Sequence, residues 1–469
     1  MTTPDYDLII IGAGPAGMAA AEEAHRQGLR CALLDEQEEA GGQIYRAIGR
    51  APLADERILG QDYYHGRDLL EAFERSGVDY RPGTTVWGIE DDLSLDVSRE
   101  GVSQRLRTRR LLVATGAQER PVPFPGWTLP GVMTGGAAQI LLKSSAMAPP
   151  GPIVLAGSGP LLLLVAAQLA RAGVRVEALL DTSPRGNWRR AARHLPGALK
   201  NPSLLAKGLG LLREIRRAGI PHLKGVDALE AFSRDGERLT HLRYRQAGES
   251  RERECRTLLV HQGVVPNVQL TRALELAHDW DEAQQCWRPR LDAWGETSRP
   301  GVFVAGDSGG IAGAQAAEES GRLAVLGIAG QLGRVNTEAR DRLAAPVRAR
   351  LAPHLAIRPF LDVLYRPARR FLVPEDDTVV CRCEEVTAGE LRRIADAGCR
   401  GPNQAKAFCR AGMGPCQGRL CGLTVSQVIA DQCNEPVAAV GYYHIRPPIK
   451  PLSLGELASL SDPDTPTRN

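Results

Sequence analysis

Residues 7–17 read Asp-Leu-Ile-Ile-Ile-Gly-Ala-Gly-Pro-Ala-Gly, a short apolar run that ends in the glycine pattern Gly12-x-Gly14-x-x-Gly17. A helical stretch follows, and residues 31–36 then read Cys-Ala-Leu-Leu-Asp-Glu. The order strand, glycine turn, helix, strand and acid is typical of a dinucleotide-binding unit. Gly12 permits the tight turn, Gly14 lets a pyrophosphate approach the backbone, and Gly17 lets the helix pack on the strand. The N-terminal part of the chain is therefore predicted to bind a dinucleotide.

The helix that begins at Pro15 and Ala16 supplies the anion site of this unit. Its first N–H groups have no partner inside the helix and its dipole favours a negative group, so a pyrophosphate would lie at its N-terminus. Asp35 ends the second strand, where an acid accepts hydrogen bonds from an adenosine ribose, and Glu36 is the neighbouring candidate. The alternative is a degenerate unit that keeps the fold without a cofactor.

Three further segments agree with a flavin site. Gly41-Gly42 follows the acid closely, residues 111–116 read as a strand with a small-residue turn, and residues 301–307 read as a strand that ends in an acid. Together they resemble the FAD-binding marks of the flavoproteins with two dinucleotide-binding domains. The resemblance implies that Asp307 contacts the flavin ribityl chain and that a helix from about Ala314 points its N-terminus at the isoalloxazine. The predicted FAD-binding residues are Gly12, Gly14, Pro15, Ala16, Gly17, Asp35, Glu36, Gly41, Gly42, Gln43, Ala114, Thr115, Gly116, Gly306 and Asp307.

Residues 153–162 repeat the pattern, with Gly157 and Gly159 in the first two glycine positions. Leu162 holds the third position and is too large for the close helix–strand contact that Gly or Ala allows. In the flavoprotein family this unit binds NAD(P)H, but Leu162 favours a domain that is empty or holds another nucleotide, such as ATP. Asp181, which ends the following strand, is the candidate ribose ligand, and His261 is expected at a domain junction.

Dithiol chemistry is excluded by the positions of the cysteines. Disulfide reductases of this superfamily carry a Cys pair after the Gly-Gly turn or inside the second domain. Here residues 43–46 read Gln-Ile-Tyr-Arg after that turn, and residues 126–254 contain no Cys. The thiolate that such a reaction needs is therefore missing from both places.

Seven of the ten Cys lie within residues 381–433. In a chain without an export signal, such clustering indicates metal rather than disulfides. Cys381-x-Cys383 and Cys416-x4-Cys421 supply four thiolates from two glycine-flanked loops, which can donate N–H groups to sulfur. This pattern resembles the bacterioferritin-associated-ferredoxin-like [2Fe–2S] module, which implies a cluster on these four thiolates; a structural zinc site is the alternative. The Cys expected to be small buried hydrophobes are Cys399, Cys409 and Cys433.

The predicted fold class is α/β, with two Rossmann-like units in a glutathione-reductase-like arrangement and a small C-terminal α-helical [2Fe–2S] module. Pro-rich segments with alternating Ile, Arg and Lys suit lying along a partner, so residues 442–452 are predicted to be a docking strap. The predicted divisions are an FAD-binding domain at 1–125 and 296–343, a second NAD(P)-like domain at 126–295, a linker at 344–374, the [2Fe–2S] module at 375–435 and a Pro-rich tail at 436–469.

The whole layout resembles the larger (A or alpha) subunit of the family of opine oxidases, D-hydroxyproline dehydrogenase and hydrogen cyanide synthase. The resemblance implies an electron-transfer subunit of an amino- or imino-acid dehydrogenase. A smaller FAD-containing (beta) subunit would oxidise the substrate C–N bond; further expectations are an FMN at a subunit interface and a third, small ferredoxin-like subunit. Alternatives are a self-contained NAD(P)H-dependent ferredoxin-type oxidoreductase, a non-catalytic scaffold and a glycine-oxidising cyanide synthase subunit. No residue is assigned a catalytic role.

Charge and hydropathy exclude other partners. The chain carries 58 Lys+Arg against 55 Asp+Glu, a formal charge of +3, so nucleic acid is not expected as a partner. The uncharged stretch 144–170 contains Pro and Gly turns, and it is interpreted as loop, strand, turn and helix start rather than a membrane span. We expect a cytoplasmic chain, whose one route to the inner membrane is peripheral, through the complex.

Overall fold

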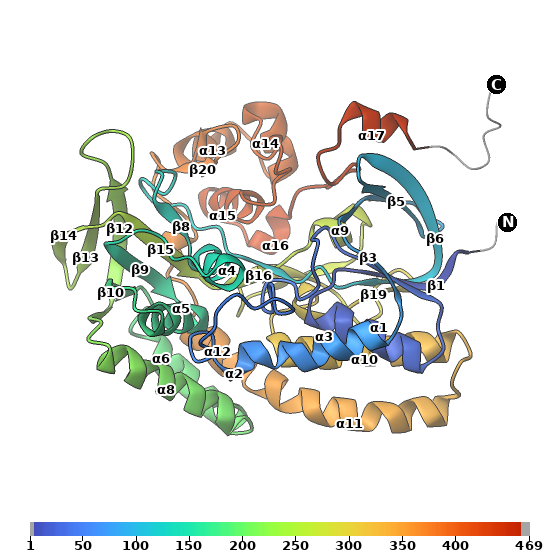
Figure 1. Ribbon diagram of the computed structural model, residues 1–469. Helices are drawn as coiled ribbons and strands as arrows, with labels where there is room; N and C mark the ends of the chain where they lie inside the picture. Colours follow the sequence, from blue (N-terminus) through green and yellow to red (C-terminus); the bar gives the residue numbers. More distant parts are fainter. Residues whose placement is uncertain (1–3, 461–469) are drawn as a thin grey trace.

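The computed structural model describes residues 4–460, which fold into an α/β protein (Figure 1). Two sheets with parallel strands form the two dinucleotide-type units, and a mainly helical part follows them in the sequence. The predicted α/β class with Rossmann-like units is confirmed. Residues 1–3 of the predicted first domain and residues 461–469 of the predicted tail lie outside the described residues.

The first sheet places the glycine turn at the carboxyl end of a central strand. β1 (Tyr6–Ile11) lies between β2 (Cys31–Leu34) and β6 (Val102–Val113), parallel to both. Residues 8–11 are buried, as a continuous apolar run predicts for a strand covered on both faces. The other strands are β3 (Asp79–Arg81), β4 (Thr84–Ile89), β5 (Ser94–Arg99) and β19 (Val302–Val304). The helices of this unit are α1 (Pro15–Arg26), α2 (Gln61–Tyr64), α3 (Gly66–Arg75) and α10 (Ala314–Gln331), with the short turn η2 (Gly306–Ser308) before α10.

The second sheet is parallel throughout, and it too places a glycine turn at the carboxyl end of a central strand. β9 (Ile153–Ser158) lies between β10 (Val176–Asp181) and β15 (Thr257–Gln262), and β11 (His222–Lys224) and β8 (Val132–Thr134) are its edges. A three-stranded antiparallel sheet is built from β12 (Val226–Phe232), β13 (His241–Gln246) and β14 (Glu249–Glu254). The helices are α4 (Gly135–Ser145), α5 (Pro160–Arg171), α6 (Asn187–Ala191), η1 (Ala192–His194), α7 (Leu195–Ala198) and α8 (Pro202–Arg217).

The two units are joined by a pair of short antiparallel strands. β7 (Ala117–Glu119) continues the chain from β6, and β16 (Val264–Pro266) follows β15, so each strand leaves a different unit before they pair. The chain returns through α9 (Gln269–Ala273) and the hairpin of β17 (His278–Asp281) and β18 (Cys286–Pro289). This junction lies next to the C-terminal part.

The segment predicted as a linker, 344–374, is mostly helical. α11 (Thr337–Ala356) and α12 (Arg358–Leu364) occupy most of it, and the turn η3 (Arg369–Phe371) follows. Arg and Ala favour the helix, and Ala344 and Val347 of α11 pack with Leu323 and Leu326 of α10. The segment 344–374 therefore contains two helices, and the apolar contacts of α11 offset its two prolines, while the domain boundaries around this linker stay a prediction.

The C-terminal part is helical, as predicted. A short ladder of β20 (Val379–Cys381) and β21 (Val386–Thr387) precedes α13 (Ala388–Asp396), α14 (Pro402–Cys409), α15 (Gly422–Cys433) and α16 (Val437–Val440). In Figure 1 these helices form an orange-to-red group beside the two sheets. Their apolar residues belong to the same buried cluster as residues of the first sheet, so the C-terminal part is packed against that sheet.

The tail after α16 folds back onto its own chain. Ile449 N donates to Trp87 O at 2.8 Å, and Ser98 Oγ donates to Glu456 in α17 (Leu454–Ala458) at 2.6 Å. Part of the predicted docking strap 442–452 is therefore packed inside the chain, because its aromatic and aliphatic residues find apolar contacts there, while its docking on a partner stays a prediction. The tail side chains that are buried in this way are Tyr442, Tyr443, Ile445 and Ile449.

Candidate functional site

The first glycine turn leaves open space in front of one glycine only. A Cβ atom on Gly12 would lie 2.5 Å from Ala114 O, and one on Gly17 would lie 1.8 Å from Gly12 O, so both positions are closed by backbone. A Cβ on Gly14 would meet only the Cα of Gly42, at 3.9 Å. Gly14 is also the N-cap of α1, without a side-chain cap and with Pro15 following. The free N–H groups of the first turn of α1 therefore face open space, as an anion site requires.

The two acids after β2 have different partners. Asp35 accepts from Ala13 N at 2.5 Å and from Gln37 N at 2.7 Å, so it braces the glycine turn. Burial raises the pKa of Asp35, although those two hydrogen bonds oppose the shift. Glu36 is half exposed and pairs with Lys450 of the tail at 2.5 Å. Asp35 therefore stands at the turn itself, whereas Glu36 anchors the tail.

The remaining predicted flavin motifs converge on the same turn. A Cβ on Gly42 would lie 2.8 Å from the Cα of Gly14, and one on Gly306 would lie 2.8 Å from the Cβ of Ala16. Asp307 accepts from Ala312 N at 2.9 Å and from Gly313 N at 3.0 Å, just before α10 begins. The structure thus brings together the segments around residues 12–17, 41–43, 114–116 and 306–307 that the sequence singled out.

The second glycine turn is backed by a histidine. A Cβ on Gly157 would lie 1.7 Å from His261 O, and one on Gly159 would lie 3.2 Å from the His261 ring. The His261 side chain is 2% exposed, and its Nδ1 lies 2.6 Å from Oε1 of Glu119 in β7. The expectation that His261 lies at a domain junction is confirmed, because β7 and β15 belong to different units. Its position beside Gly159 had no local sequence signal.

Leu162 and Asp181 complete the second turn. Leu162 is 2% exposed and lies in a buried cluster with Leu155 and Leu259 of the sheet. Asp181 accepts from Ser183 N at 2.9 Å and lies 3.5 Å from His222 Nε2. Burial alone would raise the pKa of Asp181, but the hydrogen bonds from His222 and Ser183 hold it below its ordinary value. This carboxylate is therefore already engaged within the protein.

The four cysteines of the two C-terminal loops come together. Cys421 contacts both Cys381 and Cys416 through its thiol, and Cys383 contacts Cys416. The Cys421 contact lowers the pKa of Cys381 to about 6 and that of Cys416 to about 5, while the same contacts raise the pKa of Cys421. A Cβ on Gly414 would lie 2.2 Å from the Cβ of Cys383, so a glycine is needed where the loops meet.

The four thiols contact one another in a string, in the order Cys381, Cys421, Cys416 and Cys383, and do not surround a common centre. Among residues 4–460, no group of three or more His, Cys, Asp or Glu side chains is arranged ready to hold a metal ion. The thiols differ in exposure, with Cys383 exposed, Cys416 half-buried and the other two buried. Cys399 is buried outside the string, and Cys409 and Cys433 pack against the same apolar cluster. The prediction that these three are apolar packing residues agrees with their positions.

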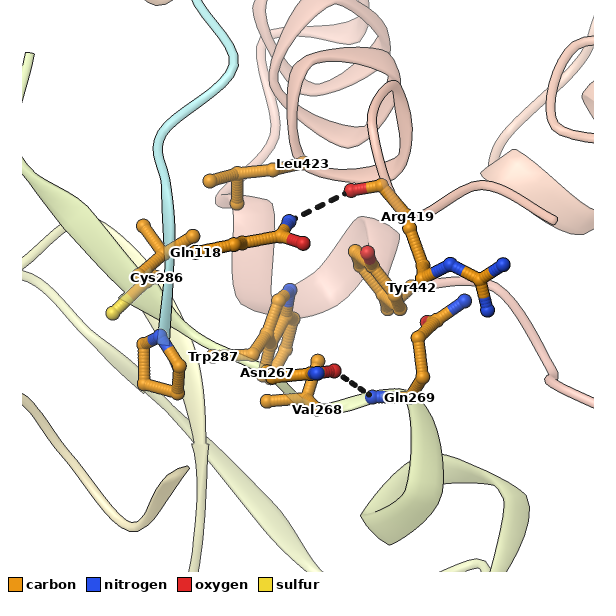
Figure 2. A pocket seen from close by; sticks show the side chains of 11 residues that line it. Gln118, Asn267, Val268, Gln269, Cys286, Trp287, Arg419, Leu423 and Tyr442 are labelled. Atoms are coloured by element: carbon orange, nitrogen blue, oxygen red, sulfur yellow. Dashed lines mark hydrogen bonds between the residues drawn. The ribbon is translucent and has the colours of Figure 1, made fainter. Parts of the chain in front are cut away.

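A narrow cavity lies where the cysteine loop meets the junction of the two units (Figure 2). Gln118 Nε2 donates to Arg419 O at 2.9 Å, and Gln269 Nε2 donates to Gln417 O at 3.0 Å. The cavity volume of about 20 Å³ suffices for one water molecule, so this is a packed contact and not a substrate pocket. Sequence reasoning missed both glutamines, although Gln118 closely follows the Thr115-Gly116 turn.

Comparison with known families first gives the class of protein. Residues 6–321 match the family described as pyridine nucleotide-disulphide oxidoreductase, and residues 375–460 match the sarcosine oxidase A3 domain. The solved structure of an L-proline dehydrogenase from P. horikoshii superposes with a TM-score of 0.69 at 19% identity, covering 96% of this chain and 79% of that one. At this identity the likeness concerns the fold, and the class is an oxidoreductase with dinucleotide-type domains.

Curated relatives then give the family. The A subunit of the opine oxidase of Agrobacterium tumefaciens (strain Ach5) is 45% identical, over 97% of this chain and 92% of that protein. Hydrogen cyanide synthase subunit HcnB of Pseudomonas aeruginosa is 37% identical, over 88% of this chain and 90% of that protein. The chain belongs to the family of these subunits, as the sequence motifs indicated. No helix within residues 4–460 is long and apolar enough to span a membrane.

Proposed function

We propose that this chain is the FAD- and [2Fe–2S]-containing electron-transfer subunit of a hetero-oligomeric amino- or imino-acid dehydrogenase of the D-hydroxyproline or opine type. In this proposal a partner flavoprotein oxidises the C–N bond of the substrate and the chain takes the electrons onward. The observation that carries it is the gathering of four thiols in loops that Gln118 and Gln269 bind directly. Gln118 closely follows the predicted flavin segment 114–116, and Gln269 lies in α9, just after the strand β16 that pairs with β7.

The residues of the first turn fit FAD. Gly14 offers open space at the N-terminus of α1, where a pyrophosphate would lie. Asp307 and the N-terminus of α10 would hold the ribityl chain and the ring end of the flavin, as the family resemblance implies. Bound FAD supplies a carrier that accepts two electrons, and the chain's own groups bind and orient it. The match to an oxidoreductase family over residues 6–321 supports this assignment.

The donor set of the C-terminal loops fits a [2Fe–2S] cluster. Four thiols connected by successive contacts, two of them with lowered pKa values, support thiolate ligation. A zinc site is the alternative that metal analysis separates. Cys416→Ala should lose iron and sulfide while the flavin stays bound, and the matched variant Cys433→Ala should keep both. Zinc without iron or sulfide in the purified chain would contradict the cluster.

The presence of partners in this proposal is supported by relatives that are themselves subunits of larger enzymes. The opine oxidase relative and the alpha chain of the sarcosine oxidase of Corynebacterium sp. (strain P-1) are both described as subunits. We therefore propose a smaller FAD-containing beta subunit; further proposed components are an FMN at the subunit interface and a third, small ferredoxin-like subunit. The amino or imino acid would be bound by the partner.

A second candidate is a cyanide synthase subunit that serves glycine oxidation. The 37% identity to hydrogen cyanide synthase subunit HcnB favours it over unrelated chemistry, and the higher identity to the opine oxidase relative favours the first candidate. A self-contained NAD(P)H-dependent enzyme is disfavoured, because His261 and Leu162 fill space around the second turn. Another nucleotide, such as ATP, would use Asp181 as its ribose ligand, in place of or beside the Ser183 and His222 partners that this carboxylate has within the protein.

Reconstitution tests the proposal. The purified chain alone should oxidise neither D-hydroxyproline nor an opine with an artificial electron acceptor, and addition of the smaller flavoprotein subunit should produce that activity. Glycine assayed in the same mixture distinguishes the second candidate through cyanide release. Full turnover by the isolated chain would contradict the assignment as an electron-transfer subunit.

A further inference from the structure

Arg272, which none of the predicted sites includes, lies in α9 beside Trp287 of β18 and Tyr442 of the tail. Its guanidinium carbon is 4.6 Å from the centre of the Trp287 ring and 5.5 Å from that of Tyr442. Its Nε and Nη2 atoms are buried and have no hydrogen-bond acceptor within residues 4–460. Arg272 thus carries a positive charge that two aromatic faces cover and that no carboxylate of the described chain neutralises.

The charge state of this side chain follows from its surroundings. Burial lowers the pKa of Arg272 to about 10, so it remains a cation at neutral pH. The neighbouring His278 does not supply a compensating charge, because burial and Arg272 itself lower the pKa of His278 to about 4. A buried, unpaired cation destabilises the folded state unless an anion lies close by. The structure therefore calls for negative charge near Arg272.

Tyr442 links Arg272 to the loop that carries Cys416 and Cys421, because it lies beside both the guanidinium and these thiols. A Cβ on Gly422, the residue after Cys421, would lie 2.6 Å from the Tyr442 hydroxyl oxygen. On the same helix as Arg272, Gln269 binds the carbonyl of Gln417, the residue after Cys416. One face of α9 therefore contacts the loop beside two of the four thiols, both directly and through Tyr442.

We propose that Arg272 is a fixed counter-charge of the cluster held by Cys381, Cys383, Cys416 and Cys421, and that it raises the reduction potential of that cluster. Gln118 and Gln269 are positioning residues, because they bind the backbone of the loop between Cys416 and Cys421 and hold it beside α9. A cluster with four thiolates is anionic and gains one further negative charge on reduction, so a nearby cation favours the reduced form. The inference rests on the proposed function, because it requires the iron–sulfur cluster.

The test is the reduction potential of the full chain, measured by a redox titration followed by electron paramagnetic resonance. Arg272→Met should lower the potential by at least about 59 mV, which is a tenfold change in the one-electron equilibrium. Arg272→Lys, which keeps the charge, should lie between the wild type and Arg272→Met. The matched control is Arg340→Met. Arg340 lies in α11, and its guanidinium carbon is 4.2 Å from the centre of the Trp294 ring, so this variant also removes an arginine that covers a tryptophan. Equal potentials in wild type and Arg272→Met would overturn the proposal.

Thermal melting of the metal-free chain gives a second readout. Without the cluster, Arg272 is an uncompensated buried charge, so metal-free Arg272→Met should melt at or above the wild-type temperature. With the cluster bound, the same variant should melt below the wild type. A metal-free variant that fails to fold would overturn the proposal. Iron and sulfide analysis separates failure of the proposed cluster from failure of the role of Arg272. A wild-type chain without iron and sulfide refutes the cluster itself. A chain that contains the cluster but has the same reduction potential in wild type and Arg272→Met refutes only the role of Arg272.

Discussion

The two glycine turns of the molecule share a sequence pattern and differ in what stands before them. A Cβ on Gly14 of the first turn would meet only the Cα of Gly42, at 3.9 Å, whereas one on Gly159 of the second would lie 3.2 Å from the His261 ring. The first turn leaves room for a phosphate group, and a protein side chain backs the second. The glycine pattern therefore predicts a turn, and the residues that face the turn decide what it can bind.

The helix after each turn repeats this contrast. Gly17 packs so closely that a Cβ would lie 1.8 Å from Gly12 O. Leu162, at the equivalent position of the second turn, is buried in the core between helix and sheet. The first helix is thus held tightly against its turn, whereas the second unit uses the same position for apolar packing. The first turn therefore has the open glycine and the closely packed helix of a nucleotide site, whereas the second has a buried leucine that contributes to the core of its domain.

The largest effect is expected from Gly14→Val. Gly14 has an extended backbone with φ of −78°, and a Cβ atom there would meet only the Cα of Gly42, at 3.9 Å, so this backbone position accepts a side chain. The added side chain would occupy the position of the pyrophosphate, so the purified variant should be folded and contain no flavin. The measurements are the absorption spectrum and the melting temperature.

The matched control for this variant is Gly186→Val. Gly186 is also the N-cap of a helix, has φ of −72° and has no atom within 4 Å of an added Cβ. It should keep its flavin at the wild-type level. Full flavin content in Gly14→Val would place the cofactor elsewhere and remove the contrast between the two turns.

The second expected effect concerns reduction by nicotinamide nucleotides. Because His261 and Leu162 take up space around the second turn, NADH and NADPH should not reduce the flavin at a useful rate. Stopped-flow mixing, with the flavin absorbance followed over time, measures this rate directly. Rapid bleaching by either nucleotide would make the second turn a working nicotinamide site and erase the difference from the first.

Local sequence patterns predicted those parts of the molecule that depend on neighbouring residues. The apolar run before Gly12 and the spacing of the glycines gave the strand, turn and helix, because each depends on a few adjacent positions. The pairs Cys381/Cys383 and Cys416/Cys421 likewise predicted four thiols in two loops. The structure brings these thiols into contact, while the group that they bind is still a prediction.

Contacts between distant segments could not be predicted in this way. His261 meets Glu119, and Gln118 meets Arg419, only after the two units and the C-terminal part have packed. The helix α11, which extends into the predicted linker, had no signal of this kind, because its stability depends on apolar residues that pack on α10. The buried contacts of the tail could not be predicted either, because they lie in sequence segments far from it.

A smaller effect is expected from Glu119→Ala, which removes the partner of His261. Glu119 accepts from Gly136 N at 2.9 Å and pairs with the buried His261 ring at 2.6 Å. Loss of these partners should cost about 1–3 kcal/mol of unfolding free energy, measured by denaturant unfolding, with the flavin retained. Glu237→Ala, at an exposed turn, serves as the control and should change stability by less than about 0.5 kcal/mol. A Glu119 variant as stable as this control would show that the junction does not depend on the pair.

The smallest effect is expected from the two strand-end acids, whose pKa values move in opposite directions. Burial raises the pKa of Asp35, so the folded state binds more protons than the unfolded state, and stability from this group falls as pH rises above about 3.9. Hydrogen bonds from His222 and Ser183 hold the pKa of Asp181 low against burial, so its contribution is present above that pH and is lost as pH falls below it. The measurement is the melting temperature between about pH 3 and pH 6. The wild type should lose stability through Asp35 as the pH rises in this range, and Asp35→Asn should not show this loss. Asp181→Asn should remove a loss on the acid side, and equal pH profiles for the two variants would contradict the assignment of opposite environments to the two turns.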